Sequence, residues 1–363
     1  MFTLKVQNFG VLKDIDIELN KTNLFIGENG SGKSVLAKLI TIVTTGIYNE
    51  DEILEKFKDF NIDYIKDNTL IEVKINNDKF LIIQGIDINF SELRKEIYKE
   101  YKNFIKLSTI TENFTNDKLR NEKKEIEKIY YNFTSQDIPA ERNLISLLNK
   151  SIYSLITSDI PLPKHLLNFA SQYEKAKNEI HEISLLKMKY KLQNGQDYIY
   201  YNENEFLPLE HSSSGIQSAL PMYLVLKYLS SSYSHIIIEE PEQNLYPKAQ
   251  MDTIKYIIQT TNNNDTHIMT HSPYVLSTLN ILLFAYKASN TNSILKDKIS
   301  KVIPLAQQIN PDEFSAYSIK DGKSISIKSQ RGLISENSID DISDILDDKF
   351  SKLMDIYSEY KNA

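Results

Sequence analysis

Residues 24–43 read LFIGENGSGKSVLAKLITIV and contain the pattern that decides the fold. Leu24 to Ile26 form a short apolar run that is typical of a buried strand. From Ser34 onward, apolar residues recur with helical spacing. Between these two elements, Gly27 to Ser34 fit G-x-x-x-x-G-K-[ST], a phosphate-binding loop that needs a strand before it and a helix after it. From average residue frequencies, a chance match in this length has a probability on the order of one in a hundred.

Each residue type in this loop has a chemical reason to be there. Glycines let backbone N–H groups curl around phosphate oxygens, and the helix behind the loop points its positive end at the anion. Lys33 is expected to reach the β- and γ-phosphates and to take part in catalysis, and Ser34 is expected to bind Mg²⁺. The residues that we predict to bind the nucleotide here are Gly27, Glu28, Asn29, Gly30, Ser31, Gly32, Lys33, Ser34 and Val35.

A second stretch, IIIEEPEQNLYP at residues 236–247, runs from three apolar residues straight into two carboxylates. The apolar run predicts a buried strand, and two glutamates at its end repel each other unless a cation lies opposite. The phosphate loop accounts for such a cation, because a bound nucleotide brings Mg²⁺, which Glu239 can bind directly or through water. Glu240 can then orient and deprotonate an attacking water. The alternative is an exposed strand end with two solvated carboxylates.

Strands and helices alternate in the parts that carry these motifs, which predicts a mostly parallel sheet with helices on its faces. Outside those parts, apolar residues alternate with polar ones over residues 2–6 and again over residues 15–19. This pattern predicts two strands joined by a turn at Phe9-Gly10. We also predict hairpins over residues 71–84 and 197–209, and helices over residues 91–133 and 143–190.

Composition limits the classes of protein that fit. There is no cysteine, which excludes disulfides and thiol catalysis and suits a reducing cytoplasm. The N-terminus MFTLKVQNFG lacks the apolar core of a signal peptide, and no apolar run approaches the roughly 20 residues of a membrane helix. The net charge of −7 argues against general attraction to nucleic acid, although a local basic face stays open.

The order of the motifs points to a family. NGSGKS, SSSGIQS, IIIEEPEQNLYP and IMTHSPYVL follow one another, and roughly 170–200 residues separate the phosphate loop from the acidic pair, whereas a simple βαβ unit needs about 30. This resembles the ATP-binding-cassette (ABC) ATPases, and more narrowly their SMC/RecF/OLD branch. VQNFGVLKDIDIELNKTNLFIGENGSGKS and IPAERN are similar to that branch as well. The resemblance covers residues 1–46 and 137–280 well and 85–135 poorly.

The resemblance assigns roles to residues of the subunit that holds the nucleotide in its phosphate loop. Gly27 to Ser34 match the Walker A loop, Glu239 the Walker B acid and Glu240 the catalytic glutamate. His271 matches the switch histidine that contacts the γ-phosphate, and residues 243–245 match the D-loop. For the glutamine that helps to hold Mg²⁺, two candidates stay open, which are Gln136 and Glu141.

The resemblance also implies a contribution from a second chain. Ser214 and Gly215 match the start of the signature sequence, which in the family binds ATP held by the opposite subunit. Ile216 stands where that signature has a second glycine. Serines and a glycine ahead of an apolar helix make sense on their own, because a helix N-terminus with free N–H groups attracts anions. The alternative role for Ser214 is an ordinary helix cap.

The fold that the resemblance implies is an α/β P-loop NTPase of ABC-ATPase type, with a mixed central sheet, an antiparallel N-terminal β-subdomain and an inserted helical region. We place the ATPase domain at residues 1–290, with a mainly helical insertion at 85–200, and a small α/β extension at 291–363. After His271 we find no Asp-x-Asp pair of a Toprim nuclease. The spacing of apolar residues over 339–353 instead predicts an amphipathic helix with a solvated acidic face.

The implied function is a cytoplasmic ATPase that uses ATP and Mg²⁺. Two copies, or a higher homo-oligomer, would sandwich ATP and act as a switch for a separately encoded nuclease or toxin in anti-phage defence. One alternative is a RecF-like repair ATPase that binds DNA, for which Lys187, Lys189 and Lys191 offer a basic strip. Another is an ATP-gated scaffold with negligible turnover. A transporter subunit fits less well, because a full LSGGQ and a clear glutamine loop are missing.

Overall fold

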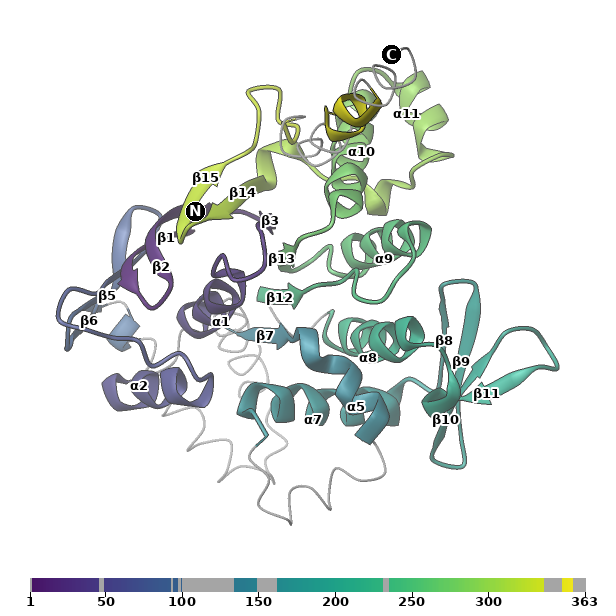
Figure 1. Cartoon of the computed structure of the whole chain (residues 1–363), viewed down its shortest axis with the longest axis horizontal. Coiled ribbons are helices and arrows are strands. Elements are labelled where there is room, and N and C mark those ends of the chain that lie inside the picture. The colour runs from purple at the N-terminus through teal and green to yellow at the C-terminus, as the bar shows by residue number, and fades with distance from the viewer. Residues whose placement is uncertain are drawn as a thin grey trace, which may run out of the picture.

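The computed structural model describes residues 2–45, 49–92, 94–96, 99, 134–148, 162–230, 235–335 and 348–354. In these residues the main element is one large mixed sheet with helices on both faces (Figure 1). Its eleven strands lie in the order β6-β5-β4-β1-β2-β15-β14-β3-β13-β12-β7. The expected α/β class and the mixed sheet are therefore confirmed.

The parallel half of the sheet carries the motifs. Its strands are β3 (Thr22–Ile26), β7 (Ser135–Ile138), β12 (His235–Glu239) and β13 (Asp265–Thr270). β12 pairs in parallel with both β7 and β13, and β13 pairs in parallel with β3. Because parallel strands all end at the same edge, the phosphate loop after β3 and the acids after β12 are brought to one side of the sheet.

The antiparallel half is built from the N-terminal residues. Its strands are β1 (Phe2–Phe9), β2 (Leu12–Leu19), β4 (Leu70–Ile75), β5 (Asp78–Gln84) and β6 (Asp87–Phe90). β1 pairs with β2 and β4, and β4 pairs with β5, all antiparallel. At the β4–β5 turn, Asn76 and Asn77 both adopt positive φ, a conformation that asparagine tolerates well. The antiparallel N-terminal strands and the first predicted hairpin are confirmed.

Two late strands join these halves. β14 (Phe314–Lys320) pairs in parallel with β3, and β15 (Lys323–Ser326) pairs with β14 and touches β2. The Tyr317 ring stacks on Phe25, with 5.8 Å between ring centroids, and its hydroxyl accepts a hydrogen bond of 2.8 Å from the backbone N–H of Glu18. The residues after 291 therefore complete the main sheet, while the domain boundary at residue 290 stays a prediction.

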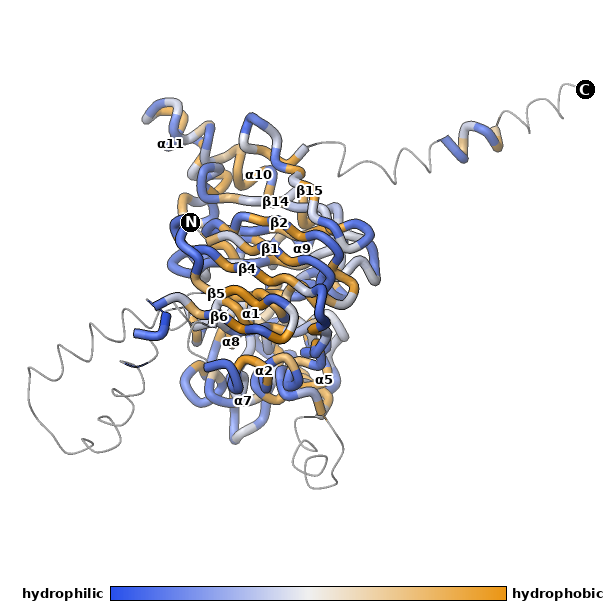
Figure 2. The backbone as a smooth tube through the Cα atoms, turned by 90° about the vertical axis from the view of Figure 1, so that its left-hand side faces the viewer, coloured by the Kyte–Doolittle hydropathy of each residue, from blue (hydrophilic) through white to orange (hydrophobic). Residues whose placement is uncertain are grey.

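Alternate residues of each central strand face opposite layers. Leu24, Ile238 and Ile268 belong to one apolar cluster, which also includes α8, α9 and α10, whereas Ile237 and Met269 belong to the other, which includes α1 and α2. Apolar segments lie inside the body and polar ones at its surface (Figure 2). The helix bounds are α1 Lys33–Thr44, α2 Glu50–Asp59, α5 Asn143–Leu148, α7 Lys164–Glu179, α8 Ser214–Leu229, α9 Pro247–Thr260, α10 Pro273–Ser289 and α11 Ser293–Ser300.

A second, four-stranded sheet projects beside α7 and α8 (Figure 1). The hairpin predicted over 197–209 is confirmed, but helix does not continue to residue 190 as expected. Residues 182–190 form strands instead, because a turn with positive φ at Leu186 and Lys187 folds them back on each other. Lys177 of α7 forms a buried ion pair of 3.0 Å with Asp197 in this sheet. The strands are β8 Glu182–Leu185, β9 Met188–Gln193, β10 Gln196–Tyr200 and β11 Phe206–Pro208.

Some predictions fall mostly outside the described residues. Of the helix predicted over 91–133, residues 91, 92, 94–96 and 99 are described, and all of them except Ser91 are helical. Of the C-terminal helix predicted over 339–353, residues 348–354 are described, and all of them are helical and exposed. In the part of the chain that the structure covers, no helix combines the length and apolar character needed to cross a bilayer. Short 3-10 helices lie at Ala140–Arg142, Leu209–His211, Leu305–Gln307 and Pro311–Glu313.

Candidate nucleotide-binding site

The phosphate loop leaves β3 at Ile26 and ends where α1 begins at Lys33, as predicted. Gly30 and Gly32 adopt φ of 80° and 107°, in the region that favours glycine, and apart from Gly30 and its two chain neighbours no heavy atom of the described residues lies within 4 Å of where a Gly30 side chain would begin. The Ser31 hydroxyl is buried without a hydrogen-bond partner. An open cradle with an unsatisfied donor fits a bound phosphate.

Lys33 lies inside this loop with only 8% of its surface exposed. Its ammonium donates hydrogen bonds of 2.6 Å to the Gly27 carbonyl and 3.0 Å to the Glu28 carbonyl. Burial lowers the pKa of Lys33, while the charges of Glu240, Glu242 and Glu239 act in the opposite direction. The lysine and these acids are therefore close enough for their charges to act on each other.

The two residues assigned to Mg²⁺ lie next to each other. Glu239 is 4% exposed at the end of β12, and the Ser34 hydroxyl interacts with its carboxylate. Burial raises the pKa of Glu239 to about 7, and Ser34 partly offsets this rise. A hydroxyl and a carboxylate are oxygen ligands of the kind that Mg²⁺ takes, so this donor pair fits the ion.

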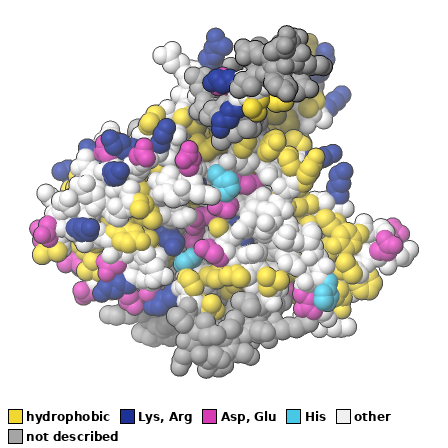
Figure 3. Space-filling model, viewed as in Figure 1, with side chains coloured by type: hydrophobic (Ala, Val, Ile, Leu, Met, Phe, Trp, Pro, Cys, Tyr) yellow, Lys and Arg dark blue, Asp and Glu magenta, His cyan; other side chains and the backbone are white. Residues whose placement is uncertain are grey.

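Glu240 and His271 meet at the adjoining ends of β12 and β13. The Nδ1 atom of His271 lies 3.6 Å from Oε1 of Glu240, and both side chains are partly exposed. Glu240 has a φ of 45°, a strained conformation for this residue, and its N–H bonds to the Met269 carbonyl at 2.9 Å. In Figure 3, acidic side chains and a histidine gather in the middle of the face, over these strand ends. The predicted catalytic acid and histidine are therefore neighbours.

Three further side chains at this site had no role assigned from the sequence. Glu242 accepts a bond of 2.5 Å from the Thr270 hydroxyl and one of 3.1 Å from the His271 N–H. Asp137 is buried on β7 with neither carboxylate oxygen hydrogen-bonded, and burial, together with Glu239, raises its pKa well above the usual range. Arg142 is fully buried and bonds to the carbonyls of Glu239 and Glu240. In the sequence, Arg142 lies within IPAERN, Glu242 lies within EEPEQN, and Asp137 directly precedes IPAERN.

The two candidates for the missing glutamine differ in their surroundings. The side-chain amide of Gln136 donates 2.5 Å to the backbone carbonyl of Asp137. Glu141 is exposed, and its charge acts on Glu239, Asp137 and Arg142. Glu141 is therefore the candidate whose charge acts on the acids of the site, and its role stays a prediction.

Ser214 and Gly215 lie elsewhere on the same chain. They open α8, with Ser214 exposed and Gly215 buried against the turn after β12. A side chain at Gly215 would come within 2.7 Å of the Asn244 carbonyl oxygen. Among the residues that the structure describes, no hydrogen bond joins either of them to the phosphate loop. One chain alone does not bring the signature-like segment and the loop together.

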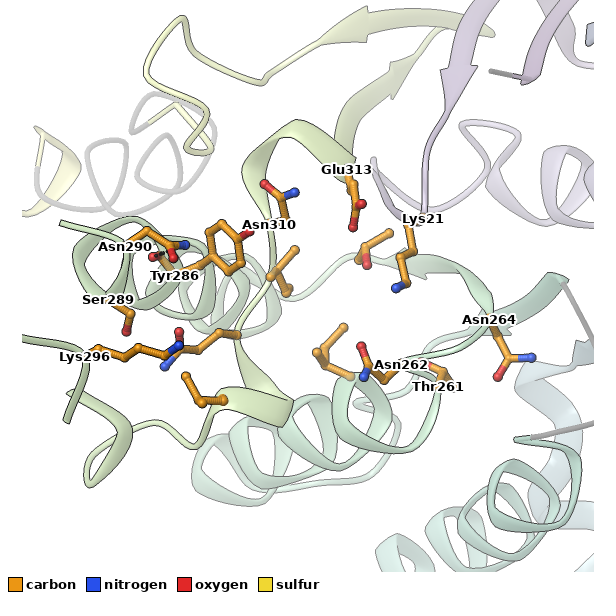
Figure 4. Close-up of a pocket in the computed structure, with 15 residues that line it drawn as sticks. Lys21, Thr261, Asn262, Asn264, Tyr286, Ser289, Asn290, Lys296, Asn310 and Glu313 are labelled. Carbon is orange, nitrogen blue, oxygen red and sulfur yellow. Dashed lines mark hydrogen bonds between the residues drawn. The ribbon is translucent and has the colours of Figure 1, made fainter. Parts of the chain in front are cut away.

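Two clefts lie at opposite ends of β3. One, of about 500 Å³, is bounded by Gly27 to Ser31, the β1–β2 turn and the β14–β15 hairpin. The other, of about 300 Å³, is lined by Thr22 at the start of β3 and by the ends of α9 and α10, and Lys21 and Glu313 extend toward its centre (Figure 4). Five strand residues span about 17 Å, so only the first cleft adjoins the phosphate loop.

Solved structures to which this chain is similar include two SMC head domains and one ABC transporter subunit. The Smc head domain with an extended coiled coil from Pyrococcus furiosus is 13% identical, with a TM-score of 0.39, over 95% of this chain and 100% of that one. The SMC head domain from Thermotoga maritima is 13% identical, with a TM-score of 0.41, over 90% and 97%. CbiO1 from Clostridium perfringens is 12% identical, with a TM-score of 0.33, over 89% and 86%.

Among proteins of curated function, no sequence matches this chain. The family described as "AAA ATPase domain" matches residues 1–276. That match spans 276 of the 363 residues and includes the phosphate loop, both acids and His271. The chain therefore belongs to the family of AAA ATPase domains.

Proposed function

We propose that this chain is an ATP-hydrolysing switch of ABC type that works as a homodimer or a higher homo-oligomer. The observation that carries the proposal is the closeness of three groups: the Ser34 hydroxyl, the buried Glu239 carboxylate, and the Lys33 ammonium, on which the charge of Glu239 acts. A hydroxyl from the start of α1, an acid from β12 and a lysine from the loop converge where a magnesium–triphosphate would lie.

Each residue has a defined task in this proposal. Lys33 exchanges its bonds to the Gly27 and Glu28 carbonyls for the β- and γ-phosphate oxygens. Ser34 and Glu239 hold Mg²⁺, which neutralises charge on the phosphates when bound. Oε1 of Glu240 accepts the proton of the attacking water, and His271, 3.6 Å away, contacts the γ-phosphate. The cleft of about 500 Å³ beside the loop has room for the base and ribose.

A second chain completes the site in this proposal. Ser214 is exposed at the N-terminus of α8, a helix of 16 residues whose first N–H groups have no carbonyl partner within the helix. An anion is a suitable partner for such a terminus, and the γ-phosphate held by the partner chain provides one. Two copies arranged head to tail would enclose two ATP molecules.

The cellular role rests on the resemblance of the sequence to the SMC/RecF/OLD branch. We propose that ATP binding and hydrolysis in the cytoplasm control a separately encoded effector, a nuclease or a toxin, in defence against phage. DNA binding is the alternative. In the strip considered for it, Lys189 is ion-paired with Glu182, and Lys191 lies 3.9 Å from the same glutamate. This pairing reduces the positive charge that the strip presents, so we place the effector role first.

The test compares wild type with Glu240→Gln in the full chain. The variant should bind ATP with wild-type affinity, accumulate as an ATP-dependent dimer in light scattering, and hydrolyse ATP at least 100-fold more slowly. Equal near-zero rates in both proteins would instead identify a scaffold. If neither protein binds ATP, the assignment of the site is wrong. Salt-dependent binding of duplex DNA by the wild type would favour the repair role.

A further inference from the structure

Arg142 makes an unusual set of contacts for a buried cation. It is fully buried in the 3-10 helix after β7, and its guanidinium donates four hydrogen bonds to backbone carbonyls. Nη1 donates to Glu239 at 2.7 Å and to Pro139 at 3.0 Å, and Nη2 donates to Glu240 at 2.6 Å. On its other edge, Nε donates to the Ser218 carbonyl at 3.2 Å. The guanidinium therefore connects backbone segments that are far apart in the sequence.

The connected segments have different tasks in the proposed function. Glu239 and Glu240 end β12 at the chain's own nucleotide, and the backbone at Glu240 is held at a φ of 45°. Ser218 lies in the first turns of α8, just behind Ser214, which would meet the nucleotide of the other chain. Arg142 lies between the two and bonds to both.

A second contact links the same two segments. The Ser218 hydroxyl donates 3.1 Å to the side-chain oxygen of Gln243, in the turn that follows Glu240. Gly215 packs against the next residue of that turn, Asn244, so closely that a side chain would collide with its carbonyl. Three contacts therefore hold the start of α8 against the end of β12 and the turn after it: the bonds of Arg142, the bond from Ser218 to Gln243, and the packing of Gly215 on Asn244.

The chemistry of arginine suits this position. Its planar guanidinium donates along two edges in a fixed geometry, whereas a lysine ammonium cannot reach acceptors on opposite sides. Burial lowers the pKa of Arg142 to about 10, and the nearby charges of Glu242, Glu240 and Glu239 act in the opposite direction. The side chain therefore remains charged near neutral pH, and its charge attracts the acids whose backbone it holds.

We propose that Arg142 is a positioning residue that couples the acids at one nucleotide to the end of α8 that meets the other. The proposal rests on the proposed function. If the carbonyls at Glu239 and Glu240 move when the γ-phosphate is bound or lost, a buried guanidinium cannot leave its N–H groups unpaired. Movement of these carbonyls therefore either displaces α8 as well or is opposed by the bond to α8. The binding of nucleotide and the association of two chains are then coupled equilibria, and each changes the other's equilibrium constant by about 5- to 150-fold.

The experiment compares Arg142→Lys with Arg94→Lys in the full chain. Arg94 is a matched control, because it is also buried but packs on Phe80 and Phe90 in the antiparallel half. Three quantities are measured: affinity for a non-hydrolysable ATP analogue, steady-state turnover, and the ATP-dependent dimer fraction in a Glu240→Gln background. For Arg142→Lys we expect affinity within about threefold of wild type, with turnover and dimerisation reduced together by about 5- to 150-fold. Arg94→Lys should leave the affinity, the turnover and the dimer fraction unchanged.

The outcomes separate this inference from the proposed function. Turnover and dimerisation that match those of Arg94→Lys would overturn the coupling and leave the ATPase assignment intact. A loss of ATP affinity as large as the loss of turnover would also overturn it, because Arg142 would then act on nucleotide binding itself. A wild type that binds ATP without dimerising would overturn both.

If Arg142→Lys fails to fold, Ser218→Ala and Gln243→Ala test the second contact between the same segments. Each should show the same pattern, in which affinity is kept while turnover and dimerisation fall together by about 2- to 10-fold. Wild-type behaviour in both would overturn the coupling.

Discussion

Replacing Glu239 by glutamine in the nucleotide-free protein should make the folded state less sensitive to pH. Burial raises the pKa of Glu239 from an ordinary value of 4.5 to about 7. Between these two pH values the folded chain keeps a proton that the unfolded chain releases. Stability therefore falls as the pH rises through this window, and it levels off above pH 7.

The size of the effect follows from the two pKa values. At 1.36 kcal/mol for each pH unit, the wild type should lose about 3 kcal/mol of unfolding free energy between pH 4.5 and pH 8 through this one group. Glutamine has a similar size and does not titrate. The gap between variant and wild type should therefore grow by about 3 kcal/mol in favour of the variant over that range.

Urea unfolding in EDTA, followed by far-ultraviolet circular dichroism, measures this gap, because the chain has no tryptophan to follow by fluorescence. Glu203→Gln, in the exposed loop between β10 and β11, is the control and should show no pH-dependent gap. Asp137→Asn should shift in the same direction as Glu239→Gln, because its carboxyl is also buried with a raised pKa. A gap for Glu239→Gln that stays constant from pH 4.5 to pH 8 would refute the reasoning.

Three other substitutions test separate parts of the site. Lys33→Ala should weaken ATP binding by about 10- to 150-fold in calorimetry, because it removes hydrogen bonds to a charged group. The exposed control is Lys248→Ala, and equal ATP affinities of the two variants would contradict this prediction. Gly215→Ala should lower the unfolding free energy by about 1–3 kcal/mol, because the new methyl group would come within 2.7 Å of the Asn244 carbonyl oxygen. An unchanged melting temperature would show that Gly215 does not pack closely against Asn244. His271→Ala should reduce turnover by about 100-fold with little change in melting temperature, since the side chain is 43% exposed, and a variant that melts early with normal turnover would show a structural role instead.

The parts of the fold and site that could be predicted are those specified by local pattern. The phosphate loop is one continuous segment, and its strand, glycines and helix are all visible within residues 24–43. The acidic pair follows directly from a buried strand. The turn at Asn76 and Asn77 identified the β4–β5 hairpin, because asparagine tolerates positive φ.

The parts that could not be predicted depend on partners far away in the chain. Arg142 binds carbonyls 97 and 98 residues further along, and Asp137 adjoins Glu239 only because β7 pairs with β12. Strand pairing is chosen by packing that local pattern does not reveal. The same reason applies to Leu186 and Lys187, where a turn converts an apparently helical, lysine-rich segment into two strands.

The position of β14 has a consequence for how the protein is made. β14, the strand beside β3 in the middle of the sheet, leaves the ribosome long after β3, since Lys320 follows Ile26 by nearly 300 residues. At 5–20 residues per second, translation exposes one flank of β3 for about 15 to 60 s before its neighbour exists. During that interval an apolar strand with unpaired N–H and C=O groups is open to other nascent chains. We expect this protein to depend on a chaperone that holds the growing chain until β14 has been translated.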